Sequence, residues 1–421
     1  MTTNRDNSNV AISIVQRGNL KSLEATLRKQ WRLGQNIVLC WSQNDNGLLV
    51  LLVPHYFLGN YSAHGDSTAE NSNEAFIRQL ISGRRRMARD AFFDVAQRLD
   101  VSATFIKLSE PLGEDAAVID AVEQIIKRYG ISYVASRAVL LFDIADFSLY
   151  SPFEQASQLN SLSYSLNSAY NKLLTKGIEI NFARTTTGDG YYVWNRDLSA
   201  QANQDLLHFL LLVIADNTLA QEASKGNTVP VIRTAFHIGS HYELYQAEGV
   251  NPTVFSYIVG DVTIELARMV DLAQPGQIFV GDFEVELLFA VDGADSSARH
   301  STLEFLAHCS QECAKLLGIQ FSGEDIAALS CKASEAAGDG GKMVARRFRL
   351  TDKHGMSRSA YNLQISLETA AGRCWSLGLG DDALPARSAG DASKAAAGED
   401  TIDERSVNAL KKRSQKTVSE E

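Results

Sequence analysis

Leu140-Leu141-Phe142-Asp143-Ile144-Ala145-Asp146-Phe147-Ser148 is an apolar run with acidic residues at its end, the pattern of a buried β-strand whose tip carries a carboxylate. Farther along, Thr185-Thr186-Thr187-Gly188-Asp189-Gly190-Tyr191-Tyr192 places a second aspartate in a turn between strand-like runs. A buried carboxylate needs a cation, a base or backbone donors. Asp143 and Asp189 could therefore hold divalent cations over a triphosphate, whereas turn capping is the alternative, above all for Asp189.

The surrounding residues alternate between strand and helix patterns from about 133 to 372. This order predicts an α+β domain with a mostly antiparallel sheet. The predicted strands are 139–142, 182–194 (a hairpin), two within 229–245, 277–280, 344–350 and 361–365, and the predicted helices are 154–176, 202–225, 262–273 and 303–317. Leu206–Ala215, the longest apolar run, has ten residues, too few to cross a bilayer, so it predicts a buried helix segment.

Residues 1–132 are predicted to form a separate N-terminal α/β region. A sensor, a dimerisation element and an extension of the catalytic sheet are all open as roles. Helical patterns cover 20–33, 73–99 and 113–129, a strand covers 47–53 and a polar loop covers 60–74. Arg84-Arg85-Arg86 falls inside the second helical pattern, which predicts a solvated basic face or, alternatively, a phosphate or partner contact.

The composition, 45% apolar and 21% charged, is that of a soluble globular protein. A net charge of −10 disfavours nucleic acids and anionic membranes as partners. The five scattered cysteines form no disulfide framework, and Cys309 and Cys313 are expected to be buried thiols rather than a zinc site. The polar start shows no signal-peptide pattern, so a cytoplasmic location is expected. Small and polar residues dominate 373–421, which predicts a disordered tail with at most a short helix near 402–412.

Several motifs together resemble the class III nucleotidyl cyclases, the catalytic domains of adenylate and guanylate cyclases. The family's metal motif F-x-D-I-x-G-F-T is similar to Phe142–Ser148, and its Gly-Asp hairpin to Gly188-Asp189. Its Gly followed eight residues later by a catalytic Arg is similar to Gly260 and Arg268, and its A-x-P-G-Q-I strand entry to Ala273–Ile278. The resemblance covers most of 133–372 and implies a ferredoxin-type sheet with covering helices.

The resemblance implies two-metal cyclisation of a nucleoside triphosphate. Asp143, Asp189 and the Ile144 carbonyl would hold two Mg²⁺ or Mn²⁺ ions, one for the ribose 3′-hydroxyl and one for the β- and γ-phosphates. Arg268 would stabilise charge on the phosphoryl group, a helix-surface ion pair being its alternative role. In this family the site forms between two subunits, so a homodimer is implied, with the metals and Arg268 from opposite chains.

Two departures from the family pattern lie near the phosphates and the ribose. Asp146 stands where the family has Gly. Ile264 stands where the family has a ribose-orienting Asn, and it cannot donate a hydrogen bond. Thr263 and Glu265 are the neighbours that could compensate.

The base-binding positions also depart from the family. They are Thr185 and Tyr257, which match neither the adenine nor the guanine pattern. A bulky Tyr257 favours a smaller base, and Arg184 could donate to a pyrimidine carbonyl unless strand alternation turns it away. With Phe147 of the first motif, these are the expected substrate-binding residues.

Other stretches resemble the bacterial pyrimidine cyclases of anti-phage defence, the Pycsar type. They are Gln158–Leu162, Asn181–Tyr191 and Asp352-Lys353-His354-Gly355. This resemblance implies synthesis of cyclic CMP or cyclic UMP, a signal for a partner effector. An adenylate or guanylate cyclase with a divergent base pocket is a second hypothesis. A catalytically inactive nucleotide-binding module is a third, favoured by Ile264 but opposed by the retained Asp143, Asp189 and Arg268.

Overall fold

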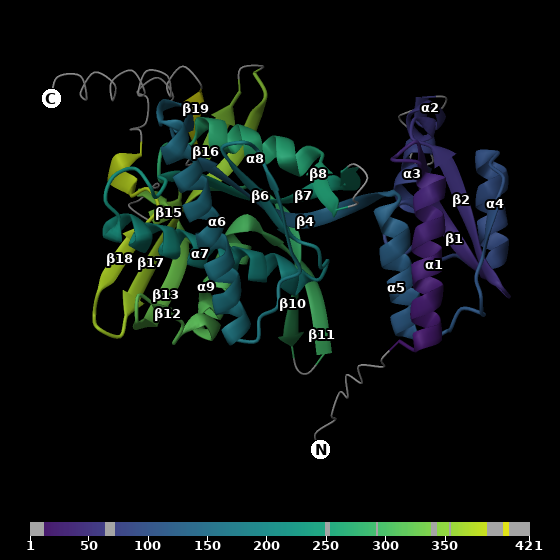
Figure 1. Ribbon diagram of the computed structural model, residues 1–421. Helices are drawn as coiled ribbons and strands as arrows, with labels where there is room; N and C mark the ends of the chain where they lie inside the picture. Colours follow the sequence, from purple (N-terminus) through teal and green to yellow (C-terminus); the bar gives the residue numbers. More distant parts are fainter. Residues whose placement is uncertain are drawn as a thin grey trace. The chain divides into compact units, whose positions relative to one another are not determined.

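The computed structural model describes residues 12–63, 72–248, 253–291, 294–337, 343–352, 355–384 and 399–403. The chain forms two compact units, 1–135 with 241–259, and 136–240 with 260–421 (Figure 1). The predicted boundary near 132 lies close to the first division. The segment 241–259 was expected in the catalytic domain, but it packs with the N-terminal residues and so belongs to the first unit.

The first unit is built on a three-stranded antiparallel sheet in the order β1–β2–β3. Leu23, Leu27 and Trp31 recur every four residues, so they share the buried face of α1, which packs with α5 against the sheet. Residues of α3 and α4 belong to the other apolar cluster of this unit. The elements are α1 Ile14–Trp31, β1 Asn36–Asn44, β2 Gly47–Pro54, α2 Phe57–Ala63, α3 Asn73–Leu80, α4 Arg89–Leu99, β3 Thr104–Lys107, α5 Ala116–Arg128 and β8 Thr253–Val259.

The arginine triplet does not lie on a helix, so the prediction of one helical segment over 73–99 is wrong. The segment between α3 and α4 runs beside β1, where the backbone of Trp41 bonds to Arg85 and Met87. Arg85 is only 1% exposed, and its guanidinium donates to the carbonyl oxygens of Leu39, at 2.7 Å, and Ile131. Burial lowers the pKa of Arg85 to about 10. Arg85 is therefore a structural residue rather than part of a solvated face.

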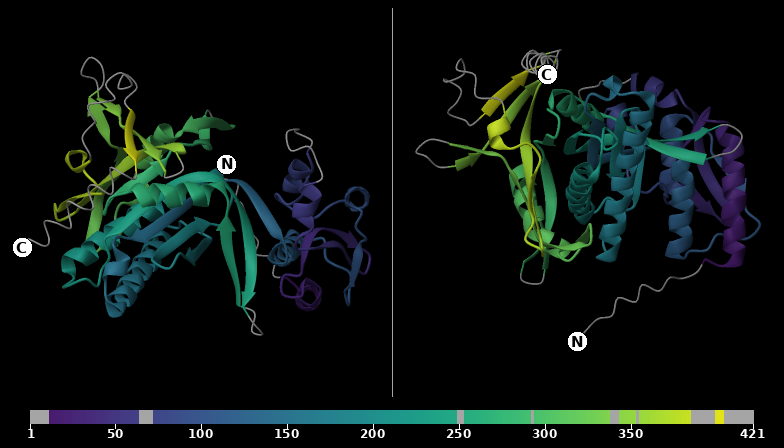
Figure 2. Two further views of the ribbon diagram at one scale, coloured as in Figure 1. Left: turned by 90° about the horizontal axis from the view of Figure 1, so that it is seen from above. Right: turned by 60° about the vertical axis from the view of Figure 1, so that its left-hand side comes forward.

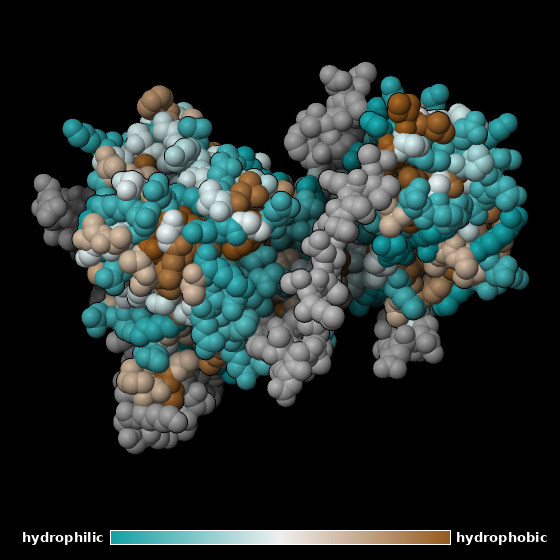
Figure 3. Space-filling model, turned by 90° about the horizontal axis from the view of Figure 1, so that it is seen from below, coloured by the Kyte–Doolittle hydropathy of each residue, from teal (hydrophilic) through white to brown (hydrophobic). Residues whose placement is uncertain are grey.

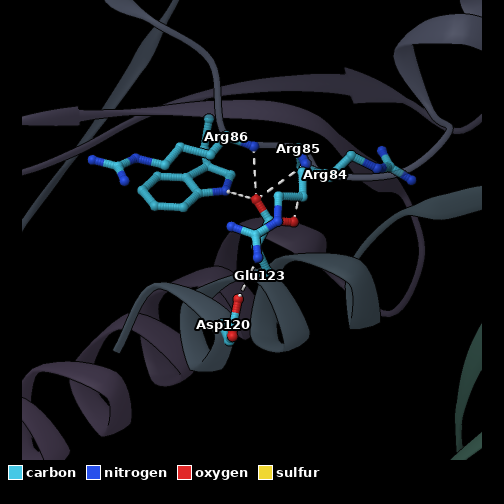
Figure 4. Close-up of polar contacts among 6 residues, drawn as sticks. Arg84, Arg85, Arg86, Asp120 and Glu123 are labelled. Atoms are coloured by element: carbon cyan, nitrogen blue, oxygen red, sulfur yellow. Dashed lines mark hydrogen bonds and ion pairs between the residues drawn. The ribbon is translucent and has the colours of Figure 1, made fainter. Parts of the chain in front are cut away.

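Glu123 of α5 holds this segment in place (Figure 4). Its carboxylate accepts hydrogen bonds from the Trp41 indole at 2.8 Å and from the backbone N–H groups of Arg85 and Arg86 at 2.9 and 2.7 Å. Arg84 pairs with Asp120, and Arg86 pairs with Glu114. Hydrophobic periodicity predicted that these backbone N–H groups would bond within a helix. They donate to a buried carboxylate instead.

The second unit contains a mixed, mainly antiparallel sheet in the order β12–β13–β17–β9–β7–β4–β6–β5, in which β7 and β9 are parallel. β4 and β7 continue past the division between the units. The strands of the path are β4 Ile131–Ile144, β5 Phe182–Thr186, β6 Gly190–Asn195, β7 Ile232–Glu248, β9 Ile278–Gly281, β12 Gln320–Phe321, β13 Glu324–Ala333 and β17 Ser357–Thr369. The others are β10 Glu284–Val291, β11 Ala294–Ser301, β14 Glu335–Ala337, β15 Met343–Ala345, β16 Arg347–Thr351, β18 Cys374–Leu377 and β19 Glu399–Asp403. The predicted α+β class is confirmed.

Helices cover both faces of this sheet. α6 Pro152–Thr175 and α7 Ala200–Ala223 lie side by side on one face (Figures 1 and 2), and α9 Thr302–Glu312 joins the same core. α8 Asp261–Leu272 lies on the opposite face, because Tyr192, which alternates with the core residue Val193 along β6, donates to the carbonyl of Thr263 at 3.0 Å. The four helices predicted for this domain are confirmed to within a few residues, except that α9 continues as a 3₁₀ turn, Cys313–Leu316.

α7 is the central helix of this core. By length and composition it could cross a membrane, but 61% of its most apolar window is buried inside the protein. His208 within it bonds to the carbonyl oxygen of Cys309 at 3.0 Å. The prediction of a buried helix segment over Leu206–Ala215 is thus confirmed. On the face shown in Figure 3, hydrophilic side chains predominate and apolar ones form separate small areas.

Two minor predictions can also be compared with the structure. Cys309 and Cys313 are buried free thiols, as expected. The predicted disordered tail is wrong for β18, which pairs with β17, and for β19, which pairs in parallel with β16. The possible helix near 402–412 lies almost entirely outside the described residues.

Candidate active site

The tips of β4 and β6 bring the two predicted metal-binding aspartates together. Asp143 lies directly across from Gly190, and the backbone N–H of Ile144 donates to the carbonyl oxygen of Asp189 at 3.0 Å. This register requires glycine at 190, because a Cβ atom there would lie 1.9 Å from the carbonyl oxygen of Phe142. The hairpin predicted around Gly188-Asp189-Gly190 is therefore confirmed, and it places both carboxylates at one edge of the sheet.

The negative charge of the Asp143 carboxylate is buried, and its neighbours neutralise it only in part. Its side chain is 13% exposed, and Arg233 of β7 donates to Oδ2 through Nε, at 2.9 Å, and Nη2. Its pKa is nevertheless raised to about 6, because burial outweighs the attraction of Arg233 and the negative charges of Asp189 and Asp271 add to the effect. Asp189 and Asp271 thus act on Asp143 as like charges, and a divalent cation at the strand tips would reduce this repulsion.

The donor set fits Mg²⁺ or Mn²⁺. Both ions prefer oxygen ligands, and Mg²⁺ in phosphoryl-transfer sites is usually held by one or two carboxylates plus substrate phosphates. The described residues contain no group of three or more acidic, histidine or cysteine side chains suited to a metal ion. Asp143 and Asp189, with Ile144 between them at the end of β4, match a site that takes its remaining ligands from substrate and solvent.

We expect cation binding to weaken as the pH falls through about 6. Protons and cations compete for the Asp143 carboxylate, so below a pKa of about 6 the apparent Kd for Mn²⁺ should rise by up to about tenfold per pH unit. Above that pKa the Kd should level off. Titration calorimetry with Mn²⁺ between pH 5 and 8 measures this dependence, and an unchanged Kd across the range would contradict it.

Asp146 stands where the similar cyclase motif has glycine, and its backbone has a conformation that glycine favours. Its backbone is left-handed, with φ of 56° and ψ of 26°, a conformation that glycine adopts freely and aspartate more readily than most other residues. Phe147, the next residue, opens a short 3₁₀ turn, Phe147–Leu149, and packs partly against the core. The turn is thus retained without glycine.

The strand β5 places Arg184 and Thr185 on opposite faces of the sheet. Thr185 pairs with Tyr192 and so shares the face covered by α8. Asp143 lies on that face too, because its neighbours Phe142 and Ile144 point into the core under α6 and α7. Arg184 instead donates to Ser163 of α6 at 3.0 Å, so the expectation that it contacts a base bound near Asp143 is not supported.

Neither neighbour of Ile264 is positioned to replace the ribose-binding Asn. Thr263 Oγ1 is engaged by Gly260, accepting from its N–H at 3.1 Å and donating to its carbonyl oxygen at 2.8 Å. Glu265 forms an ion pair with Arg358. Ile264 itself is 45% exposed. Tyr257, the second base position, belongs to the first unit, where it pairs with Leu244 and is partly exposed.

Arg268 makes its contacts with residues other than the aspartate pair. Among the described residues, its Nε is 3.1 Å from Oδ2 of Asp352, and its Nη1 is 3.8 Å from the sulfur of Met356. α8 turns Val262, Leu266 and Met269 inward, whereas Arg268 is only partly buried. One chain therefore presents two separate clusters, Asp143 with Asp189, and Arg268 with Asp352.

Two charged residues that act on Asp143, Arg233 and Asp271, are not among the site residues predicted from the sequence. Arg233 begins the apolar segment Arg233–Gly239, and a cation at the start of a buried strand is a signal for a carboxylate partner. Asp271 stands in the last turn of α8, where the helix dipole disfavours an acid. Both lie far from Asp143 in the sequence, so only the fold brings their charges close enough to act on its carboxylate.

No family model and no curated protein matches this chain. Solved structures similar to it include the guanylate cyclase domain of RhGC from Catenaria anguillulae, with 17% identity, 40% of this chain and 97% of that chain covered, and a TM-score of 0.29. The monomeric guanylyl cyclase domain of the RhoGC fusion protein from Blastocladiella emersonii has 18% identity, coverages of 37% and 92%, and a TM-score of 0.28. The adenylyl cyclase CyaB from P. aeruginosa has 14% identity, coverages of 41% and 94%, and a TM-score of 0.28. At these values the similarity does not assign the chain to a family.

Proposed function

We propose that the second unit is a nucleotidyl cyclase that converts a nucleoside triphosphate to its 3′,5′-cyclic monophosphate and pyrophosphate. The observation that carries this proposal is the pair Asp143 and Asp189, held at adjacent strand tips with unbalanced negative charge. The motif spacing from Gly260 to Arg268 supports it, because it adds a guanidinium suited to a triphosphate.

Each residue has a separate task in this proposal. Asp143 and Asp189 hold the divalent cations, and Arg233 and the ionised Asp143 fix each other's orientation. When bound, the cations supply Lewis acidity that favours the ribose 3′-alkoxide and offsets the charge of the phosphates. The 3′-oxygen attacks the α-phosphorus, the bond from that phosphorus to the bridging oxygen breaks, pyrophosphate leaves, and the hydroxyl proton passes to solvent. Arg268 donates to phosphoryl oxygens as their charge increases.

Within the described part of one chain, Arg268 contacts Asp352 and Met356 rather than the aspartate pair, which supports a homodimer. A dimer in which Arg268 of one chain serves the aspartate pair of the other would complete two equivalent sites. The exposed Ile264 lies one turn from Arg268 on α8, so contact with a second chain would also cover an apolar side chain.

For the substrate we propose CTP or UTP. The support is the absence of a purine pattern at Thr185 and Tyr257 and the likeness of three stretches to the pyrimidine cyclases of anti-phage defence. The product would then be a cytoplasmic signal for a partner effector. Arg184 has no part in this proposal, because it faces α6.

The test is to incubate the purified protein with Mn²⁺ and ATP, GTP, CTP or UTP separately and to identify products by mass spectrometry. We expect cyclic CMP or cyclic UMP, and none from an Asp143→Asn variant. Formation of cyclic AMP or cyclic GMP would support cyclase activity but overturn the proposal of a pyrimidine substrate. No product from any of the four would overturn the proposed function in favour of a nucleotide-binding module.

That second candidate has one specific observation in its favour. Ile264 lacks the ribose contact, and Thr263 and Glu265 are already engaged. Calorimetric binding of a triphosphate without turnover would identify it.

A further inference from the structure

A chain of alternating charges joins α8 to the connection between β16 and β17. Glu265 pairs with Arg358, Arg358 Nη1 lies 4.0 Å from Asp352 Oδ2, and the same oxygen lies 3.1 Å from Arg268 Nε. Glu265 and Arg268 are one turn apart on α8, so the two guanidinium contacts fix one side of this helix. The side chain of Asp352 is 11% exposed and that of Arg268 26%, so solvent screens their attraction only in part.

The backbone fixes Asp352 itself. Its Oδ1 accepts a hydrogen bond from the N–H of Met356 at 3.0 Å, and its own N–H donates to the Met356 carbonyl at 3.1 Å. One carboxylate oxygen is thus tied to the backbone of Met356, and the other lies at ion-pair distance from Arg268. A carboxylate that is held in this way fixes the position of a negative charge beside the guanidinium before substrate binds.

The ion pair with Asp352 involves the Nε side of the Arg268 guanidinium rather than its Nη side. Asp352 lies beside Nε, whereas among the described residues the partner of Nη1 is the weak acceptor sulfur of Met356, 3.8 Å away. A guanidinium has five N–H donors, so the Nη groups keep donors for oxygen atoms of a triphosphate. The ion pair therefore orients Arg268 without occupying its phosphate-binding edge.

We propose that Asp352 is a positioning residue that holds the Arg268 guanidinium with its Nη edge toward the phosphates of the substrate. This rests on the proposed function. The contact is not a simple surface ion pair, since Asp352 is 11% exposed, accepts a hydrogen bond from the Met356 N–H and has Arg358 Nη1 4.0 Å from its Oδ2. Without its negative charge, Arg268 would sample other rotamers, and the loss would appear in the rate of the chemical step rather than in substrate affinity.

The experiment is a double-mutant cycle of Asp352→Asn and Arg268→Lys in the full chain. Asp352→Asn keeps the size of the side chain and an acceptor for Met356 but removes the charge. We expect kcat to fall about tenfold to a hundredfold, with KM unchanged within about threefold. In the Arg268→Lys background the same change should alter kcat by less than about twofold, because it acts through Arg268.

Asp216→Asn is the matched control. Asp216 is paired with Lys172 and is 12% exposed, close to the 11% of Asp352, but it lies between α6 and α7. We expect it to lower the melting temperature and to leave kcat within about twofold. A fall in kcat equal to that of Asp352→Asn would show that general destabilisation explains both.

Two further outcomes would overturn the proposal. Wild-type or higher kcat in Asp352→Asn would mean that Asp352 does not position Arg268 or that it restrains activity. Independent, multiplying effects of the two substitutions would separate Asp352 from Arg268. Absence of product from the wild-type chain with all four triphosphates is a different failure, that of the proposed function. The same cycle in thermal unfolding measures the ion pair without substrate.

Discussion

Asp143→Asn and Asp189→Asn should each lower nucleotide turnover by about a thousandfold or more. Either change halves the carboxylate set at the tips of β4 and β6, and asparagine is a much weaker ligand for a hard cation. The decisive measurement is the initial rate of cyclic nucleotide formation at saturating Mn²⁺, paired with calorimetric titration of the cation. Loss of both activity and cation binding is expected.

The two substitutions should differ in their effect on stability. Asp143→Asn leaves Arg233 without its carboxylate partner, and a buried charge that loses its partner destabilises the fold by about 3–5 kcal/mol at most. The Asp189 carboxylate accepts a hydrogen bond from the nearby Thr187 hydroxyl at 3.1 Å, which an asparagine oxygen can replace, so Asp189→Asn should unfold close to the wild-type temperature. Asp325→Asn, an exposed change on β13, is the control and should keep full activity. Normal turnover by either site variant with its fold intact would rule out the metal assignment.

Arg268→Ala should lower kcat by about a hundredfold to a thousandfold, since it removes the donor assigned to the phosphoryl oxygens. Its stability cost should be modest, because Asp352 keeps the hydrogen bond from the Met356 N–H and the nearby charge of Arg358. The informative step is to mix inactive Arg268→Ala chains with inactive Asp143→Asn chains and to let the subunits exchange. If the site takes the aspartates from one chain and Arg268 from the other, half of the dimers regain one of their two sites, about a quarter of wild-type activity.

A site made within one chain gives the opposite result. Every chain in the mixture then lacks either Arg268 or Asp143, and activity stays at the level of the separate variants. Size-exclusion chromatography with light scattering serves as the control for this experiment, because subunit exchange requires dimers. A monomeric wild-type protein with full turnover would refute the two-chain arrangement directly.

The features that the sequence predicted correctly depend on interactions between residues that are close in sequence or directly opposed in a strand pair. The β4 strand, the Gly188-Asp189-Gly190 hairpin and the meeting of their aspartates depend on residues that are close in sequence, or on a glycine whose Cβ would collide with the facing strand. Apolar periodicity likewise placed the helices of the second unit. Such patterns predict secondary structure well, because each residue in the pattern favours the same backbone conformation.

The errors all involve contacts between distant residues. Arg84–Arg86 matched a helix pattern, and only Glu123 and the carbonyl oxygens that hold Arg85 explain why the helix is broken there. The direction of Arg184 depended on which face of β5 is covered by α6. The roles proposed for Arg233 and Asp352 depend on their contacts with Asp143 and Arg268, respectively. In both pairs the partners are about ninety positions apart in sequence.

The way the chain passes between its units limits how this protein can be shortened. Residues 241–259 belong to the first unit, so the backbone passes from one unit to the other more than once. Tyr242 of this segment packs on Tyr133 with ring centroids 5.2 Å apart and belongs to a cluster with residues of α3 and α4. A truncated chain that began near residue 133 would keep this segment but lose the core that buries it. The N-terminal unit is therefore not a detachable module, and a deletion at a single point in the chain cannot remove it whole.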